Sequence, residues 1–254
     1  MGQQVKVTGI VLSATNVGEY DKRVVLLTKE RGKIAAFARG ARKMNSPLLA
    51  ACQPFTYGVF TVFEGKNYNI NGAEVEDYFK ELRTDLQCLY RGFYFCEMAD
   101  YFTVERNDEL LIMQLLYLSL NALRKKVIDQ ELIQIIYEIK ILALFGLMME
   151  TGQCICCSIQ CKETGTEEPS VLTHFCSEKG GVVCSKCAMH LSHTIPLQES
   201  TLYALQFILS QPVTKLFRFQ VTKEVLRELK QISADYQRVH VNHKFQSLEF
   251  LKLI

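Results

Sequence analysis

The hydrophobic pattern of the chain changes its period at about residue 81, and this change limits which folds the chain can adopt. Before this point, short segments rich in β-branched and aromatic residues alternate with turn signals such as Gly18-Glu19 and Arg31-Gly32. After it, apolar residues recur at i, i+3, i+4 and i+7, the repeat of a helix with one buried face. We therefore expect an α+β protein of several domains, with a sheet part followed by a helical part.

Residues 1–80 predict five short strands. The segments are "VKVTGIVLS", "RVVLLTKE", "KIAAFARG", "FTYGVFTVFE" and "YNINGAEVE". Five strands in so short a stretch favour a small closed barrel. The OB-fold is the common five-stranded barrel of this kind, and it frequently binds single-stranded nucleic acid.

The rest of the chain predicts helices on both sides of a cysteine-rich segment. We expect them at residues 85–104, 109–123, 130–150, 198–210, about 222–236 and 243–253. The most apolar of them carries Gln134, Glu138 and Lys140, which indicates a buried helix rather than a membrane span. The start "MGQQVKVTGIV" does not resemble a secretory signal, so we expect a cytoplasmic protein. Disulfides are rare in that compartment, which shifts clustered cysteines toward metal or redox chemistry.

Six cysteines occur in two bursts, "CICCSIQC" at 154–161 and "CSKC" at 184–187. A tetrahedral zinc site commonly uses two Cys-x-x-Cys pairs, because two intervening residues let the chain turn both thiolates toward one ion. Only Cys154 and Cys157 have this spacing in the first burst, and Cys184 and Cys187 have it in the second. We therefore predict one structural zinc ion held by these four residues. The 26 residues between the pairs exceed the usual roughly 15–20, so "KETGTEEPS" is expected to form a protruding loop.

Other interpretations of the cysteines stay open. The pairs could form a thioredoxin-like redox motif or could simply be buried thiols. His174, His190 or His193 could replace one cysteine ligand. We expect Cys156, Cys161 and Cys176 to have no metal role, and Cys52, Cys88 and Cys96 to be core residues.

Charge is distributed unevenly along the chain. Residues 22–43 contain eight Lys and Arg against one acidic residue, a net charge of +7, whereas residues 81–150 carry −4. Phosphates pair with cations and bases stack on aromatic rings in sequence-tolerant single-strand sites. The predicted nucleic-acid-binding residues are Lys22, Arg23, Arg31, Lys33, Phe37, Arg39, Arg42 and Lys43. The alternative is an ordinary solvated sheet face. No nucleotide-binding or hydrolase motif is found in the sequence, so we expect no enzymatic activity.

Several segments, taken in order, resemble the RecO family of bacterial recombination mediators. They are "ARGARK", "SPLLAACQPF", "GGVVCSKC" and the closing "KFQSLEFL", and the likeness runs nearly end to end. The surplus cysteines, and Cys176 in "FCSEKGG", depart from the family pattern.

The resemblance implies an OB-fold DNA-binding domain at 1–80, the first part of a helical domain at 81–150, an inserted zinc module at 151–194, and the second part of the helical domain at 195–254. It also implies a non-enzymatic, nucleoid-associated protein of DNA repair that binds single- and double-stranded DNA and anneals complementary strands. The implied partners are RecR, the C-terminal tail of single-strand binding protein and, indirectly, RecF and RecA, with RecA being loaded onto DNA coated by single-strand binding protein. An RNA-binding accessory protein of translation or RNA processing, and an adaptor that ignores nucleic acid, are the alternatives.

Overall fold

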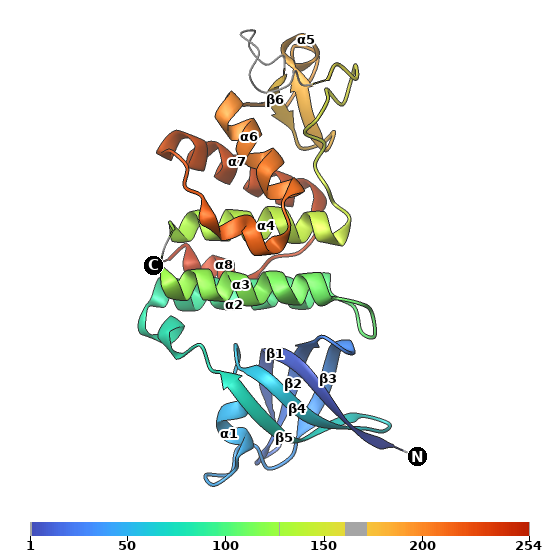
Figure 1. Cartoon of the computed structure of the whole chain (residues 1–254). Coiled ribbons are helices and arrows are strands. Elements are labelled where there is room, and N and C mark those ends of the chain that lie inside the picture. The colour runs from blue at the N-terminus through green and yellow to red at the C-terminus, as the bar shows by residue number, and fades with distance from the viewer. Residues whose placement is uncertain (1, 127, 161–171, 254) are drawn as a thin grey trace. The chain divides into compact units, whose positions relative to one another are not determined.

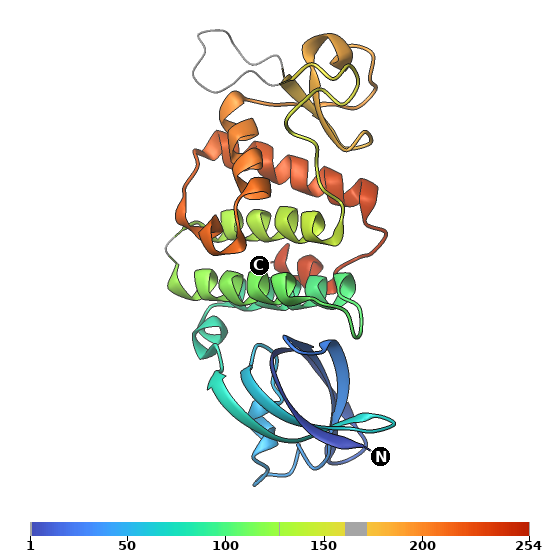
Figure 2. The ribbon, with the colours of Figure 1, turned by 45° about the vertical axis from the view of Figure 1, so that its right-hand side comes forward.

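The computed structural model describes residues 2–126, 128–160 and 172–253, which form a mixed α+β protein (Figures 1 and 2). Contacts divide the chain into two compact units. The first contains Met1–Gln130 and Phe245–Ile254, and the second contains Glu131–Lys244. The expected fold class is confirmed. The four predicted domains divide the helices differently from these units, and they stay a prediction about which parts fold independently.

A closed five-stranded barrel forms the start of the first unit (Figure 1). Its strands are β1 (Gln3–Val17), β2 (Asp21–Thr28), β3 (Gly32–Ala38), β4 (Tyr57–Glu64) and β5 (Tyr68–Asp77). Their order around the barrel is β1-β2-β3-β5-β4. The β3–β5 pair is parallel, and the other pairs are antiparallel. This is the OB-fold expected from the sequence. The short helix α1 (Leu48–Ala51) follows β3 and lies against the barrel core.

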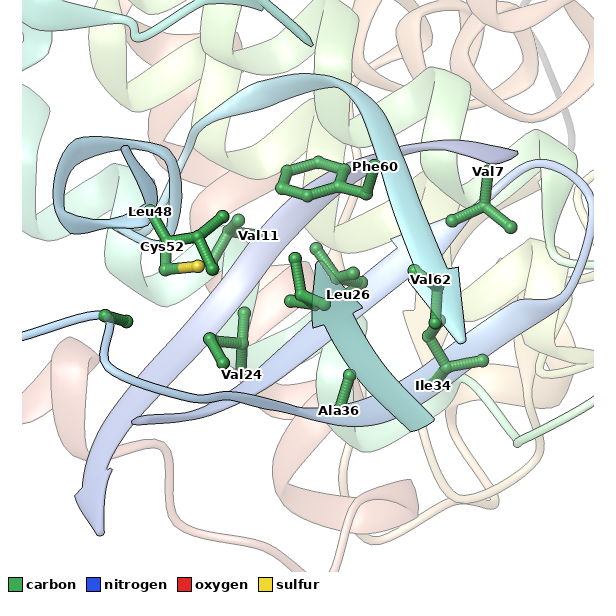
Figure 3. Close-up of a cluster of buried hydrophobic side chains, with 13 residues drawn as sticks. Val7, Val11, Val24, Leu26, Ile34, Ala36, Leu48, Cys52, Phe60 and Val62 are labelled. Carbon is green, nitrogen blue, oxygen red and sulfur yellow. The ribbon is translucent and has the colours of Figure 1, made fainter. Parts of the chain in front are cut away.

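The barrel is filled by residues of one parity on each strand, as Figure 3 shows. Val24 and Leu26 on β2 meet Ile34 on β3 and Phe60 and Val62 on β4, all of them buried. The opposite parity is also covered in places. Tyr57 on the outer side of β4 packs on Tyr117 of helix α3 (Leu110–Lys125), with ring centroids 4.8 Å apart. Both faces of this strand therefore carry packed aromatic or aliphatic side chains.

Helices complete the first unit. They are η1 (Lys80–Thr84), α2 (Leu86–Phe102), α3 and α8 (Gln246–Leu251). Asp85 caps α2 by accepting N–H bonds from Gln87 at 2.9 Å and Cys88 at 3.3 Å. The carboxylate of Glu97 on α2 accepts the N–H groups of Gln246 and Ser247 at 2.8 and 2.9 Å, and so caps α8. Phe245, just before α8, packs on the Tyr94 and Tyr101 rings of α2 at 5.5 and 5.7 Å.

Helices also form most of the second unit. They are α4 (Gln130–Phe145), α6 (Glu199–Ser210), η2 (Val213–Arg218) and α7 (Lys223–His240). The polar residues that marked α4 as a buried helix have partners inside the protein. Lys140 donates to the carbonyl oxygens of Ile208, Leu209 and Gln211 at 3.1, 2.7 and 2.8 Å, and Glu138 accepts from the Ser233 hydroxyl at 2.6 Å. No helix among the described residues combines the length and apolar character that a membrane span requires.

The cysteine-rich segment forms a small three-stranded sheet within the second unit (Figure 1). Its strands are β6 (Leu172–Cys176), β7 (Gly181–Cys184) and β8 (Ile195–Pro196), in the order β7-β6-β8, with the short helix α5 (Ser185–Ala188) after β7. Gly180 allows the tight turn between β6 and β7, because its φ of 83° disfavours a side chain.

Candidate metal centre and nucleic-acid interface

The four cysteines predicted from spacing lie together. The sulfur atoms of Cys154, Cys157, Cys184 and Cys187 all lie within 4.8 Å of one another. Cys154 and Cys184 are buried, Cys187 is half-buried and Cys157 is exposed, so the group lies at the edge of the small sheet. This is the only group of three or more such ligands found among the described residues.

Local backbone structure places each pair. In the first pair, the Cys154 N–H donates to the Ile159 carbonyl and the Ser158 N–H donates to the Cys154 carbonyl, both at 2.8 Å, and Ser158 has a positive φ of 59°. These bonds form a tight turn that brings Cys157 back beside Cys154. In the second pair, Cys184 ends β7 and Cys187 lies one helical turn further, on α5. The spacing of two residues therefore has the geometric role that the sequence predicted.

The separations fit a tetrahedral ion. Four sulfur ligands at about 2.3 Å from one zinc ion would lie about 3.8 Å from each other. The Sγ atoms of Cys157 and Cys184 are 3.8 Å apart, and the Cys184 N–H lies 3.3 Å from Cys154 Sγ, where it can stabilise a thiolate. Four sulfur ligands leave no position for a reactive water molecule, so the donor set suits a structural ion.

The pKa values of Cys154 and Cys187 also favour a cation at this place. Burial raises the pKa of the Cys154 thiol, but hydrogen bonds from the N–H groups of Cys184, Cys156 and Cys157 outweigh burial and lower it to about 6. Hydrogen bonding with the Cys184 thiol raises the pKa of Cys187. Neighbouring thiolates oppose each other's ionisation, and a divalent cation at their centre would remove that opposition.

The other candidate ligands lie elsewhere. Cys156 is exposed and Cys176 is buried in β6, and neither belongs to the group. Among the histidines, the His174 ring bonds the Thr173 hydroxyl at 2.9 Å, and none joins the group of described ligands. Cys161 and the segment "KETGTEEPS" lie outside the described residues. Cys52, Cys88 and Cys96 are buried core residues, as predicted.

The eight predicted nucleic-acid-binding residues do not form one patch. Arg39, Arg42 and Lys43 are exposed in the segment that follows β3. Next to this segment, Arg23 on β2 pairs directly with Phe37 on β3. The two share the outer side of the barrel, with Arg23 exposed and Phe37 half-buried. These five residues form one end of the barrel surface.

Two further cations lie at the opposite end of the same strands. Lys33 is the second residue of β3, roughly 20 Å along the strand direction from Arg39, and its Nζ donates to the Asp100 carboxylate of α2 at 3.0 Å. Arg31 lies in the β2–β3 turn, and its guanidinium nitrogen is 3.6 Å from a carboxylate oxygen of Glu64. Both cations already serve contacts within the first unit.

Lys22 lies in the barrel rather than on its surface. Its side chain shares the parity of Val24 and Leu26, only 7% of the residue is exposed, and its Nζ lies 3.5 Å from the Cys52 carbonyl oxygen. Of the eight residues it is therefore the least able to contact a phosphate.

Tyr20 lies beside the exposed cations, although it is not among the residues predicted to bind nucleic acid. The tyrosine lies in the β1–β2 turn and is 47% exposed, with Lys43 Nζ 5.5 Å from its ring centroid. We call Tyr20, Arg39, Arg42 and Lys43 the basic loop surface. The sequence feature that could have identified Tyr20 as a binding residue is its place in a glycine-containing turn directly before the cationic run at 22–43.

Comparison with known proteins finds matches to nearly the whole chain. The family model described as "Recombination protein O N terminal" matches residues 1–79, and "Recombination protein O C terminal" matches residues 83–249. DNA repair protein RecO of Acetivibrio thermocellus is 30% identical over 252 residues, covering 98% of this chain and 96% of that protein. The proteins of the same name from Alkaliphilus metalliredigens and Bacillus subtilis are each 30% identical, covering 98% and 97% of this chain and 99% and 93% of their own lengths.

The two family matches correspond to the OB-fold barrel and to the part of the chain that holds the helices and the four cysteines. The relatives match over nearly their full length, so the likeness covers the complete arrangement rather than one common barrel. The chain therefore belongs to the RecO family of DNA repair and recombination proteins.

Proposed function

We propose that the protein is a non-enzymatic recombination mediator that binds single- and double-stranded DNA through the barrel and anneals complementary strands. The observation that supports this most directly is the basic loop surface. Its three cations are exposed, and none of them forms an ion pair with a carboxylate in the part of the chain that the structure describes. Such cations can bind phosphates without first leaving an acidic partner.

Annealing requires a surface of this kind. A protein that brings two strands together must neutralise the phosphates of both without holding the bases of either in a sequence-specific pocket. Exposed cations on loops meet this need, and the reaction needs no nucleotide. We therefore propose annealing without ATP, suppressed by high salt, because each phosphate contact that forms releases counterions from the DNA and so weakens as salt rises.

Family membership supports the cellular role. The relatives are named as DNA repair proteins, which favours DNA over the RNA-binding alternative. We propose that the protein acts on DNA coated by single-strand binding protein, whose C-terminal tail it contacts, and helps to load RecA together with RecR. The acidic helical region at 81–150, rather than the basic loop surface, would serve these protein contacts.

The zinc ion is the proposed cofactor. Cys154, Cys157, Cys184 and Cys187 would hold it, and its part would be structural: it would cross-link the turn at 154–159 to the end of β7. No step of DNA binding is assigned to the metal.

One experiment tests DNA binding and annealing together. The triple variant Arg39→Ala, Arg42→Ala, Lys43→Ala should bind oligonucleotides of any sequence more weakly. The slope of log K against log salt should fall by about 0.7 for each lost single-strand phosphate contact, or about 2 in all. The variant should also anneal complementary strands more slowly, both naked and coated with single-strand binding protein. The matched control is Lys215→Ala, Arg218→Ala, Lys223→Ala, which removes three exposed cations from the second unit.

Equal affinity, salt slope and annealing rate in the triple variant and the wild type would contradict the DNA-binding role of the loop surface. Good binding of naked DNA without annealing of coated strands would contradict the mediator role. Equal annealing of DNA and RNA strands would leave the RNA alternative in place.

A further inference from the structure

Tyr20 presents a large ring to solvent beside the exposed cations of the barrel. Its ring is half-exposed, whereas most aromatic residues of the first unit lie in the core or in the stack formed by α2 and α8. Tyr20 also packs against no other aromatic ring among the described residues. A turn needs no tyrosine for its backbone geometry, so the fold itself does not explain this ring.

Hydrogen bonds hold Tyr20 and the cations in one rigid arrangement. The Arg42 N–H donates to the Tyr20 carbonyl at 2.9 Å, and the Arg42 guanidinium donates to the Gly18 carbonyl at 3.1 Å. Asp21 accepts the Gly40 N–H at 2.7 Å. The β1–β2 turn is thus bonded twice to the segment after β3 and once more through Asp21, so the backbone that carries the ring is held in place before a ligand binds.

The surroundings of the ring match one kind of ligand. Lys43 Nζ lies 5.5 Å from the ring centroid, and Arg42 is bonded to the same turn. An aromatic ring with one cation over a face and a second cation bonded to the same turn suits a flat aromatic group that carries a negative charge beside it. An unpaired nucleotide has this chemistry, because its base can stack on the ring while its phosphate meets the cations.

We propose that Tyr20 is a base-stacking residue that makes the basic loop surface bind single-stranded DNA more tightly than double-stranded DNA. This inference rests on the proposed DNA interface. The cations bind phosphates of either form, but the bases of a duplex are already stacked within it. The ring therefore adds affinity only where a base is unpaired.

Paired oligonucleotides separate stacking from charge. We would compare binding of an oligo-dT, an abasic oligonucleotide with the same number of phosphates, and a duplex. Tyr20→Ala should weaken oligo-dT binding about tenfold, which corresponds to about 1.4 kcal/mol and lies within the range for stacking one base on an aromatic ring. It should leave abasic and duplex binding and the salt slope unchanged. Tyr20→Phe, which keeps the ring, should bind like the wild type, as should Tyr203→Ala, which removes an exposed tyrosine of the second unit.

A second variant reports stacking directly. The chain contains no tryptophan, so Tyr20→Trp introduces a single tryptophan, whose fluorescence can be excited apart from that of the tyrosines. Its emission should be quenched by oligo-dT and unchanged by the abasic oligonucleotide at the same degree of saturation. Equal quenching by both, or an equal loss of affinity for both in Tyr20→Ala, would overturn the stacking role while leaving the DNA interface intact. Failure of the wild type to bind any of the three nucleic acids would instead overturn the interface, and the stacking role with it.

Discussion

Neighbouring cysteines with opposite expected roles provide a sharp test of the metal centre. Cys156 and Cys157 are adjacent and both exposed, but only Cys157 belongs to the group of four sulfur atoms. Replacing either one by serine makes the same chemical change at nearly the same place. The only difference that the geometry provides is whether a ligand is lost.

The magnitude follows from the arrangement of the ligands. The Cys157–Cys184 separation of 3.8 Å is that of a regular tetrahedron around zinc, and we divide the binding free energy equally among the four ligands. Structural zinc binds with about 10–16 kcal/mol in small modules. One quarter of that is about 3 kcal/mol, so Cys157→Ser should weaken zinc binding about 100-fold. Cys156→Ser should bind zinc like the wild type.

The assay is zinc retention in the purified full-length protein during titration with a chelator of known affinity, with metal content measured by mass spectrometry. Wild type and Cys156→Ser should keep about one zinc ion per chain at chelator levels that strip Cys157→Ser. Cobalt exchange gives an independent readout, because the absorption bands report the number of thiolate ligands. Loss of zinc from Cys156→Ser together with retention in Cys157→Ser would refute the assignment of the first pair.

The remaining predictions concern stability. Hydrogen bonds from Lys126 and the Cys88 N–H lower the pKa of Asp85 to about 2, below its value in the unfolded chain. The ionised carboxylate therefore stabilises the fold above about pH 4, and this contribution is lost as the pH falls through about 2. Asp85→Ala should therefore lower the free energy of unfolding by about 1 kcal/mol at neutral pH and by less near pH 3, whereas Asp85→Asn should keep most of the cap. Thermal unfolding at the two pH values measures both effects. A loss in Asp85→Ala that does not depend on pH would contradict the charge effect. Lys140→Met should lower the free energy of unfolding in urea by about 2–4 kcal/mol, because three carbonyl groups at the end of α6 lose a charged donor and the relief of burying an ammonium group offsets only part of that loss. Unchanged stability in Lys140→Met would mean that water replaces these bonds.

Features that depend on local pattern could be predicted from the sequence. The strands of the barrel follow from short β-branched segments between turns, and the cysteine group follows from two-residue spacing, because both depend on neighbouring residues. The side of the barrel on which a residue lies depends instead on register. Phe60 and Val62 occupy the alternate positions of β4 that also hold Gly58 and Glu64, and the sequence alone does not show that this side faces the core. Both side chains point into the barrel, and so does Lys22.

Contacts between distant segments were beyond prediction. The run at 22–43 reads as one charged stretch, but the β2–β3 hairpin carries its cations to opposite ends of two strands. Tyr20 gains its setting from Arg42 and Lys43, which lie more than twenty positions along the chain. No pattern within the β1–β2 turn contains that information.

The return of the chain end to helix α2 has a consequence for folding during synthesis. Phe245 and α8 complete the aromatic and capping contacts of α2, but residues 131–244 are translated between these two parts of the same unit. At about 5–20 residues per second, the ribosome takes roughly 6–25 s to produce that intervening stretch. The barrel can close early, because all five strands precede residue 78. The rings of Tyr94 and Tyr101, in contrast, have no Phe245 partner until that residue has been synthesised, so the segment that begins at Phe245 determines when the first unit is finished.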